Sequence, residues 1–193
     1  MAMNLPNGLT VARLFLGPVI LACLLAGQIA VAFYLFVAAM ITDLYDGYLA
    51  RRSHSVTEFG KLMDPLADKV LVSLALVGFV LLRVPFVGIW MAAAIIGREL
   101  LILGWRTGAV KSGDGFVTSR MAKWKTAAQM AWVALILLYL TLHAYAGNAP
   151  SDSGGDAGSV VLWILGLGTV VITLASGAEY ILNGRQRAGE VAS

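Results

Sequence analysis

The sequence has few charged residues and a single cysteine. Charged side chains make up 13% of its 193 residues and hydrophobic ones 59%, which gives a mean hydropathy of +0.81. Soluble globular domains carry about a quarter charged residues. The composition therefore excludes an ordinary water-soluble domain, a disordered chain and a nucleic-acid-binding tail. Cys23 has no partner for an internal disulfide, so a disulfide-rich secreted scaffold is excluded as well.

The sequence contains six long apolar runs. About 20 apolar residues in a helix are needed to cross the hydrocarbon core of a bilayer. The runs predict an all-α integral membrane protein with six transmembrane helices, in which residues 1–193 form one domain. A cleaved signal peptide is the alternative for the first run, but Arg13 lies inside it and no clear cleavage site follows. The approximate runs are Val11–Ala26, Ile29–Leu49, Leu62–Leu82, Phe86–Trp105, Ala122–Leu142 and Ser159–Leu182.

Lysine and arginine gather in alternate connections between the runs. They are frequent in residues 51–61, in residues 106–120 and after the last run, whereas the other connections hold only Arg83. The positive-inside rule then places both termini and these two connections in the cytoplasm. The chain is thus expected to be a multi-pass protein of the inner (plasma) membrane. Residues 149–158, rich in glycine, serine and aspartate, are expected to form a flexible outer loop.

Four carboxylates interrupt the second and third runs at helical spacing. Asp43 and Asp46 are three residues apart, and Asp64 and Asp68 are four apart, so each pair shares one helical face. A charged side chain at the bilayer centre costs roughly 2.5–3.5 kcal/mol. The four side chains are therefore expected to face a polar cavity that opens to the cytoplasm. The alternative is that single aspartates make hydrogen bonds that only help the helices to pack.

Carboxylates that converge in this way need a counter-charge. At an effective dielectric constant of 20, two of them about 4 Å apart repel by about 4 kcal/mol, so they must be protonated, paired or bound to metal. Carboxylate oxygens suit hard cations such as Mg²⁺ or Mn²⁺. Four carboxylates from two helices suit a two-metal site of the phosphoryl-transfer type. We therefore expect Asp43, Asp46, Asp64 and Asp68 to bind two divalent ions.

The spacing Asp43-x2-Asp46-Gly47-x2-Ala50-Arg51-x8-Gly60-x3-Asp64-x3-Asp68 resembles, at every fixed position, the signature of the CDP-alcohol phosphatidyltransferase family. The resemblance implies a homodimer in the lipid bilayer that transfers a phosphatidyl group from CDP-diacylglycerol to an alcohol and releases CMP. It also implies that Asp68 is the base that takes the proton from the acceptor hydroxyl. The residues that it implies for CDP-diacylglycerol binding are Asn7, Thr10, Gly47, Ala50, Arg51 and Thr57.

A second cluster of charged residues, all basic, is expected on the same side of the membrane. A basic pocket beside a metal site suits an acceptor that carries its own phosphate, which favours glycerol 3-phosphate over serine or a neutral alcohol. Anchoring at the membrane interface is the alternative reading for any one lysine. Residues 97–102 and 123–130 also resemble one subfamily, the phosphatidylglycerophosphate synthases. The expected phosphate-binding residues are Arg98, Lys111, Arg120, Lys123 and Lys125.

Two alternatives to this function remain at the level of sequence. The first is the same reaction with another acceptor, either inositol phosphate or phosphatidylglycerol. The second is a divalent cation transporter, which would also explain acidic residues inside membrane spans. A transporter does not require Gly47, Arg51 or the basic cluster, and it should have a polar path through the outer half of the membrane, where the runs are apolar.

Overall fold

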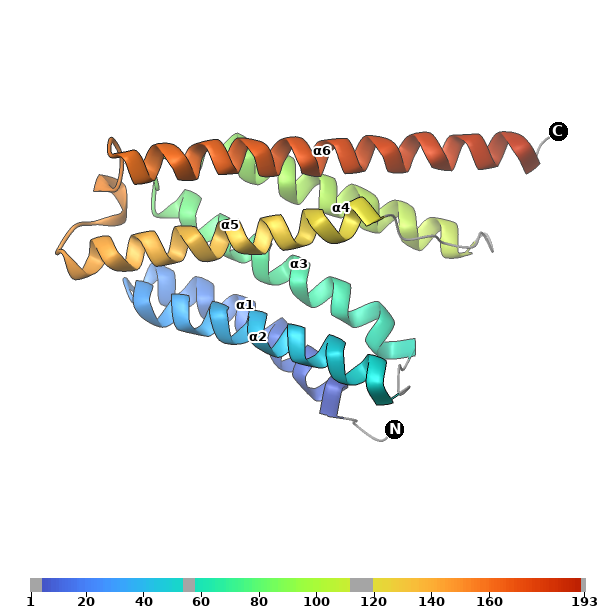
Figure 1. Cartoon of the computed structure of the whole chain (residues 1–193), viewed down its shortest axis with the longest axis horizontal. Coiled ribbons are helices and arrows are strands. Elements are labelled where there is room, and N and C mark those ends of the chain that lie inside the picture. Colours follow the sequence, from blue (N-terminus) through green and yellow to red (C-terminus); the bar gives the residue numbers. More distant parts are fainter. Residues whose placement is uncertain (1–4, 54–57, 112–119, 192–193) are drawn as a thin grey trace.

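The chain folds as a bundle of long helices (Figure 1). The computed structural model describes the backbone of residues 5–53, 58–111 and 120–191. It describes the side chains of residues 12–43, 66–104, 124–150 and 152–178. The prediction of an all-helical chain is confirmed. The helices are α1 (Leu5–Leu25), α2 (Ile29–Ser53), α3 (Glu58–Leu81), α4 (Ile89–Lys111), α5 (Arg120–Tyr145) and α6 (Ala157–Val191), with a short 3-10 helix, η1 (Pro150–Asp152), before α6.

The helices are longer than the apolar runs at the end of the bundle where the charged residues lie. The sequence predicts a hinge over residues 51–60, but α2 continues to Ser53 and α3 begins at Glu58. In the same way α4 continues to Lys111 and α6 to Val191. Lys, Arg and Glu are good helix formers, so a helix does not have to end where its apolar stretch ends. Both termini lie at this end of the bundle (Figure 1), as the distribution of positive charge predicts.

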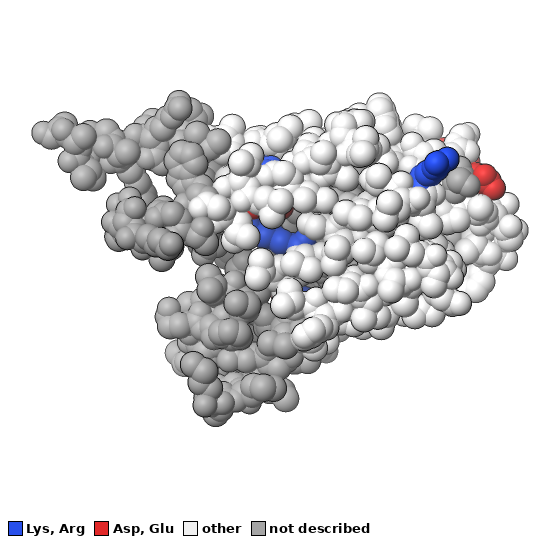
Figure 2. All heavy atoms as spheres, turned by 180° about the vertical axis from the view of Figure 1, so that it is seen from behind, with Lys and Arg blue, Asp and Glu red and all other residues white. Residues whose placement is uncertain are grey.

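Two of the described helices, Trp124–Tyr145 and Ala157–Ala178, are long and apolar enough to cross a membrane. Ala12–Leu25 and Ile29–Asp43 form shorter apolar stretches. Apolar side chains also cover much of the outer surface, where Leu101 and Trp124 are both 76% exposed. On the face shown in Figure 2 most of the described surface is white, and charged residues gather mainly in a depression and at one end of the bundle. These features fit a membrane protein, and a crossing by every helix stays a prediction.

All six described α-helices contribute to the buried apolar core, which includes the packing of α1 against α3. Ile20 and Leu24 on α1 are fully buried, as are Leu71 and Phe79 on α3. Gly17 lets the two helices approach closely, because a Cβ atom there would lie 3.2 Å from Leu74 and 3.3 Å from Val70. This close packing brings Arg13, one turn before Gly17 on α1, close to Asp68, one turn before Leu71 on α3.

The segment predicted to be a flexible outer loop is held by hydrogen bonds instead. The Tyr139 hydroxyl on α5 lies 2.7 Å from Asp156 Oδ1 and 2.8 Å from the Ser153 carbonyl oxygen, and these two acceptors share its single hydrogen. Asp156 also accepts the Ser159 backbone N–H at 2.8 Å and so caps the first turn of α6. The hydrogen bond from Tyr139 holds the pKa of the exposed Asp156 carboxyl below its usual value, and the Ser159 N–H adds to this effect. Glycine and serine content predicted a loop but could not show these contacts.

Candidate functional site

Arg13 joins the second and third helices through their carboxylates. Its Nη1 lies 2.9 Å from Asp43 Oδ1 on α2 and 3.3 Å from Asp68 Oδ1 on α3. The Arg13 side chain is 1% exposed, whereas Asp43 is 33% exposed and Asp68 17%. A buried guanidinium is stable only with such partners. The two carboxylates and one guanidinium leave a net charge of −1 at this point, which we call the carboxylate site.

The other two predicted metal ligands lie one helical turn from this site along the backbone. Asp46 follows Asp43 on α2, and Asp64 precedes Asp68 on α3. Their side chains lie outside the described residues. Among the described residues, no group of three His, Cys, Asp or Glu side chains gathers as a metal site would require. The convergence of Asp43 and Asp68 from two helices is therefore the part of the predicted quartet that the structure places.

The chemistry of the site suits a hard divalent cation. Its donors are carboxylate oxygens, and both aspartates keep part of their surface exposed. Two further carboxylates on the same helices would raise the negative charge beyond what Arg13 neutralises. The residues present therefore fit the divalent metal that the sequence predicts. Asp43 and Asp68 would hold it, with Asp46 and Asp64 as the additional ligands.

A second polar cluster is centred on Glu99, which lies on α4 and is 5% exposed. Lys125 on α5 donates a short hydrogen bond to Glu99 Oε1. Arg98 Nη1 lies 3.2 Å from the same oxygen, and Lys69 Nζ on α3 lies 3.4 Å from Oε2. Three cations thus surround one carboxylate, and the net charge of this cation cluster is +2.

The sixth helix supports the cation cluster through Arg98. Arg98 Nη2 donates to Ser176 Oγ at 3.0 Å, and that hydroxyl donates to the Thr173 carbonyl at 2.9 Å. Gly177 leaves room for the arginine, because a Cβ atom there would lie 3.2 Å from Arg98 Nε. Arg98 Nε itself is buried without a hydrogen-bond partner. The cluster is thereby held by α3, α4, α5 and α6 together.

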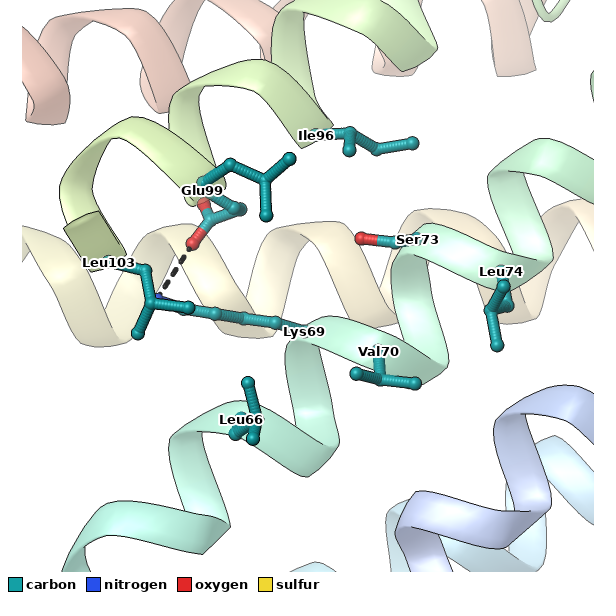
Figure 3. Close-up of a pocket in the computed structure, with 9 residues that line it drawn as sticks. Leu66, Lys69, Val70, Ser73, Leu74, Ile96, Glu99 and Leu103 are labelled. Atoms are coloured by element: carbon teal, nitrogen blue, oxygen red, sulfur yellow. Dashed lines mark ion pairs between the residues drawn. The ribbon is translucent and has the colours of Figure 1, made fainter.

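A hollow of about 200 Å³ opens between α3 and α4 beside this cluster (Figure 3). Most of its described lining residues are apolar side chains of the two helices, and Lys69 and Glu99 are the charged residues among them. Figure 3 shows the Lys69 side chain reaching from α3 toward Glu99 on α4. Basic and acidic atoms appear together in a depression of the surface in Figure 2. The second coloured patch lies at the far end of the bundle.

The predicted residues therefore fall into those that the structure brings together and those that it leaves undescribed. Asp43 and Asp68 meet at Arg13, and Arg98 and Lys125 meet at Glu99. The side chains outside the described residues are those of Asn7, Thr10, Asp46, Gly47, Ala50, Arg51, Asp64, Lys111, Arg120 and Lys123, and Thr57 lies outside the described backbone as well.

The sequence did not predict three of these roles. Arg13 lies inside the first apolar run, and no spacing in the sequence shows that it joins two aspartates. Lys69 directly follows Asp68 in the sequence, yet its ammonium pairs with Glu99 on another helix. Glu99 lies within residues 97–102, which resemble the subfamily, but the sequence does not show that three cations surround it. A lone charge within an apolar run signals a buried partner, but it does not identify that partner.

Comparison with known proteins identifies the family. A family model described as CDP-alcohol phosphatidyltransferase matches residues 3–175. A Bacillus subtilis protein named CDP-diacylglycerol–glycerol-3-phosphate 3-phosphatidyltransferase is 35% identical, over 92% of this chain and 93% of its own length. Proteins of the same name from Rickettsia felis and Pseudomonas fluorescens are 35% and 39% identical, over 87% and 74% of this chain and 90% and 75% of their own lengths. The chain therefore belongs to the CDP-alcohol phosphatidyltransferase family of enzymes, and the predicted resemblance is confirmed.

Proposed function

We propose that this protein transfers the phosphatidyl group of CDP-diacylglycerol to glycerol 3-phosphate and forms phosphatidylglycerophosphate and CMP. The observation that carries the proposal is that α3 contributes to both charged groups. Asp68 belongs to the carboxylate site, and the next residue, Lys69, belongs to the cation cluster. The names of the relatives state the same two substrates.

The carboxylate site supplies the groups that the transfer of a phosphatidyl unit requires. Asp43, Asp46, Asp64 and Asp68 would hold two Mg²⁺ or Mn²⁺ ions, which when bound neutralise the charge of the pyrophosphate linkage and orient it. Asp68 accepts the proton of the acceptor hydroxyl at its carboxylate. Arg13 on α1 contacts both Asp43 and Asp68 and so fixes their positions relative to each other. Asp68, the proposed base, is therefore in position before the acceptor binds.

The remaining donor contacts follow from the family pattern. Asn7, Thr10, Gly47, Ala50, Arg51 and Thr57 are proposed to bind the CDP part of the donor. The acyl chains stay in the bilayer, which is consistent with the apolar outer surface of the helices. Gly47 and Ala50 are small, so a bulky nucleotide could approach the α2 backbone there.

The cation cluster is proposed to bind the acceptor's phosphate. Arg98 and Lys125 lie in the cluster, and Lys111, Arg120 and Lys123 are assigned to the same role from sequence. A net charge of +2 inside the bundle favours a phosphorylated acceptor over a neutral one. This charge also disfavours a divalent cation transporter, because a cation that entered here would be repelled.

One assay tests the proposal. The purified protein in detergent, with Mg²⁺ and CDP-diacylglycerol, is offered glycerol 3-phosphate, inositol phosphate, phosphatidylglycerol or serine, and CMP release is measured. CMP release that is fastest with glycerol 3-phosphate supports the proposal. Release only with inositol phosphate or with phosphatidylglycerol would assign another acceptor. No release with any acceptor would overturn phosphatidyl transfer and leave the transporter as the alternative.

Location, orientation and oligomeric state are further proposals. We place the protein as a homodimer in the inner membrane, with both termini and the active site facing the cytoplasm. The beginning of α1 and the end of α6 lie at the same end of the bundle, and the basic residues in the sequence assign that end to the cytoplasm. Replacement of the single cysteine, Cys23, by serine allows single cysteines to be introduced at residues 2 and 192. Labelling of these positions by an impermeant maleimide in right-side-out vesicles would contradict the orientation.

A further inference from the structure

Lys69 is the most accessible of the three cations around Glu99. Its side chain is 24% exposed, compared with 10% for Arg98 and 5% for Lys125. Arg98 is also held by Ser176 on α6, and Lys125 makes a short hydrogen bond to Glu99. Lys69 makes the longest contact with that carboxylate, at 3.4 Å. It is therefore the cation that can turn toward a ligand with the smallest loss of existing contacts.

The cluster has a charge that its own residues do not balance. Among the side chains that the structure describes, three cations face one carboxylate, and buried charge without a counter-charge is costly. A phosphate monoester carries about −1.5 to −2 at neutral pH. One such group would neutralise the cluster. A carboxylate, with a single charge, would do so only in part.

The position of Lys69 on α3 links this charge to the reaction site. Consecutive helical residues rise by about 1.5 Å and differ in direction by about 100°. Asp68 accordingly faces Arg13, whereas Lys69 faces Glu99 beside the hollow in Figure 3. The carboxylate site and the cation cluster are therefore joined by two consecutive residues of α3. An alcohol that carries its phosphate only a few bonds from the reacting hydroxyl matches this arrangement.

We propose that Lys69 contacts the phosphate of the acceptor and selects phosphorylated over unphosphorylated alcohols, and that Glu99 is a positioning residue that holds Lys69 at the edge of the cluster. This inference rests on the proposed function, and it assigns the accessible phosphate contact to a residue outside the set that the sequence predicts. Arg98 and Lys125 then supply the buried part of the positive charge. Lys69 also lines the hollow between α3 and α4.

The test compares Lys69→Met with the wild-type protein in detergent with Mg²⁺. Methionine keeps the length and the apolar stem but removes the charge. We expect KM for glycerol 3-phosphate to rise about ten- to a hundredfold, the effect of losing one charge-assisted hydrogen bond. KM for CDP-diacylglycerol should change less than about twofold, and slow CMP release with glycerol should be the same in both proteins. Lys69→Arg should restore most of the acceptor affinity because it restores the charge.

Two control variants separate this role from general damage. Ser73→Ala alters the same hollow without a change in charge. Arg83→Asn removes a cation at the opposite end of the bundle, at a backbone φ of 54° that asparagine tolerates. Both should keep the wild-type KM for glycerol 3-phosphate. If Lys69→Met does not fold, Lys69→Gln provides a second variant without the charge.

The outcomes distinguish the inference from the function on which it rests. A wild-type protein that releases no CMP with glycerol 3-phosphate overturns the proposed function. An active wild-type protein with an unchanged acceptor KM in the lysine variants overturns only the role of Lys69. An equal rise in both KM values also overturns that role, because it would indicate structural damage. A rise confined to the phosphorylated acceptor supports it.

Discussion

Arg13 Nη1 lies 3.3 Å from Asp68 Oδ1, although 55 residues separate the two along the chain. The same nitrogen lies 2.9 Å from Asp43 Oδ1. The first helix thus brings a buried positive charge to two aspartates that the sequence assigns to metal binding. The guanidinium and a divalent metal would neutralise the same carboxylates, so the stability of the fold should depend on both.

Substitution Arg13→Met should make the protein depend on Mg²⁺ for stability. Removing one partner of a buried ion pair costs about 3–5 kcal/mol, and here it leaves Asp43 and Asp68 without their shared cation. We expect Tm in detergent with EDTA to fall well below that of the wild type. Addition of Mg²⁺ should raise Tm more in the variant than in the wild type. An equal effect of Mg²⁺ on both proteins would count against metal binding by these aspartates.

Substitution Asp68→Asn should abolish turnover without unfolding the protein. An amide cannot accept the hydroxyl proton and binds metal less well, so we expect CMP release to fall by about 10²–10⁴-fold. The matched control is Asp156→Asn, which removes a carboxylate from the connection before α6, at the end of the bundle opposite to the beginning of α3 (Figure 1). The control should keep wild-type turnover. Near-normal turnover in Asp68→Asn would disprove its assignment as the base.

The sequence predicted the carboxylate site better than it predicted its counter-charges. Spacings of three and four residues place the aspartates on one face of each helix, whatever the details of packing. The partner of a buried cation depends instead on how helices cross, and Arg13 meets Asp68 because Gly17 lets α1 approach α3. Lys69 is next to Asp68 in sequence yet faces Glu99, since one step along a helix turns a side chain by about 100°.

The connection between α5 and α6 also shows how little of a structure composition alone can predict. Residues 149–158 are rich in residues that favour loops, and composition alone predicts flexibility. The Tyr139 hydroxyl, from a helix predicted only as an apolar span, holds Ser153 and Asp156 in place. The last residues of α2 and α4 and the first residue of α3 could not be predicted either, because charged helix formers continue a helix beyond its apolar stretch.

The cation cluster should show strong coupling between Glu99 and Lys125. Glu99→Leu leaves three cations without their shared carboxylate and should destabilise the protein by about 3–5 kcal/mol. Lys125→Met should cost less, because Glu99 keeps Arg98 and Lys69 as partners. In the Lys125→Met background, Glu99→Leu should cost less than it does in the wild type, by about 0.5–3 kcal/mol. Denaturant unfolding in detergent of the four proteins measures this coupling. Additive effects would show that the two side chains act independently.

Substitution Arg98→Ala should raise KM for glycerol 3-phosphate far more than KM for CDP-diacylglycerol. The variant loses a cation of the cluster as well as the contact with Ser176 on α6. Ser176→Ala is the control, because it removes the contact with α6 and keeps the charge. We expect about a tenfold change in acceptor KM for Arg98→Ala and little change for the control. Equal effects of the two variants would assign Arg98 to helix packing alone.

The hydrogen bonds to Asp156 should make the outer connection sensitive to acid. Because Tyr139 and the Ser159 N–H hold the pKa of Asp156 below its ordinary value of 3.8, the carboxylate contributes stability that is fully present above pH 3.8. That contribution is lost as the pH falls from 3.8 through the lower pKa of the folded state. Asp156→Asn should therefore lower Tm at neutral pH, and its difference from the wild type should shrink at acidic pH. A constant difference in Tm at all pH values would show that the ionised carboxylate does not stabilise the connection.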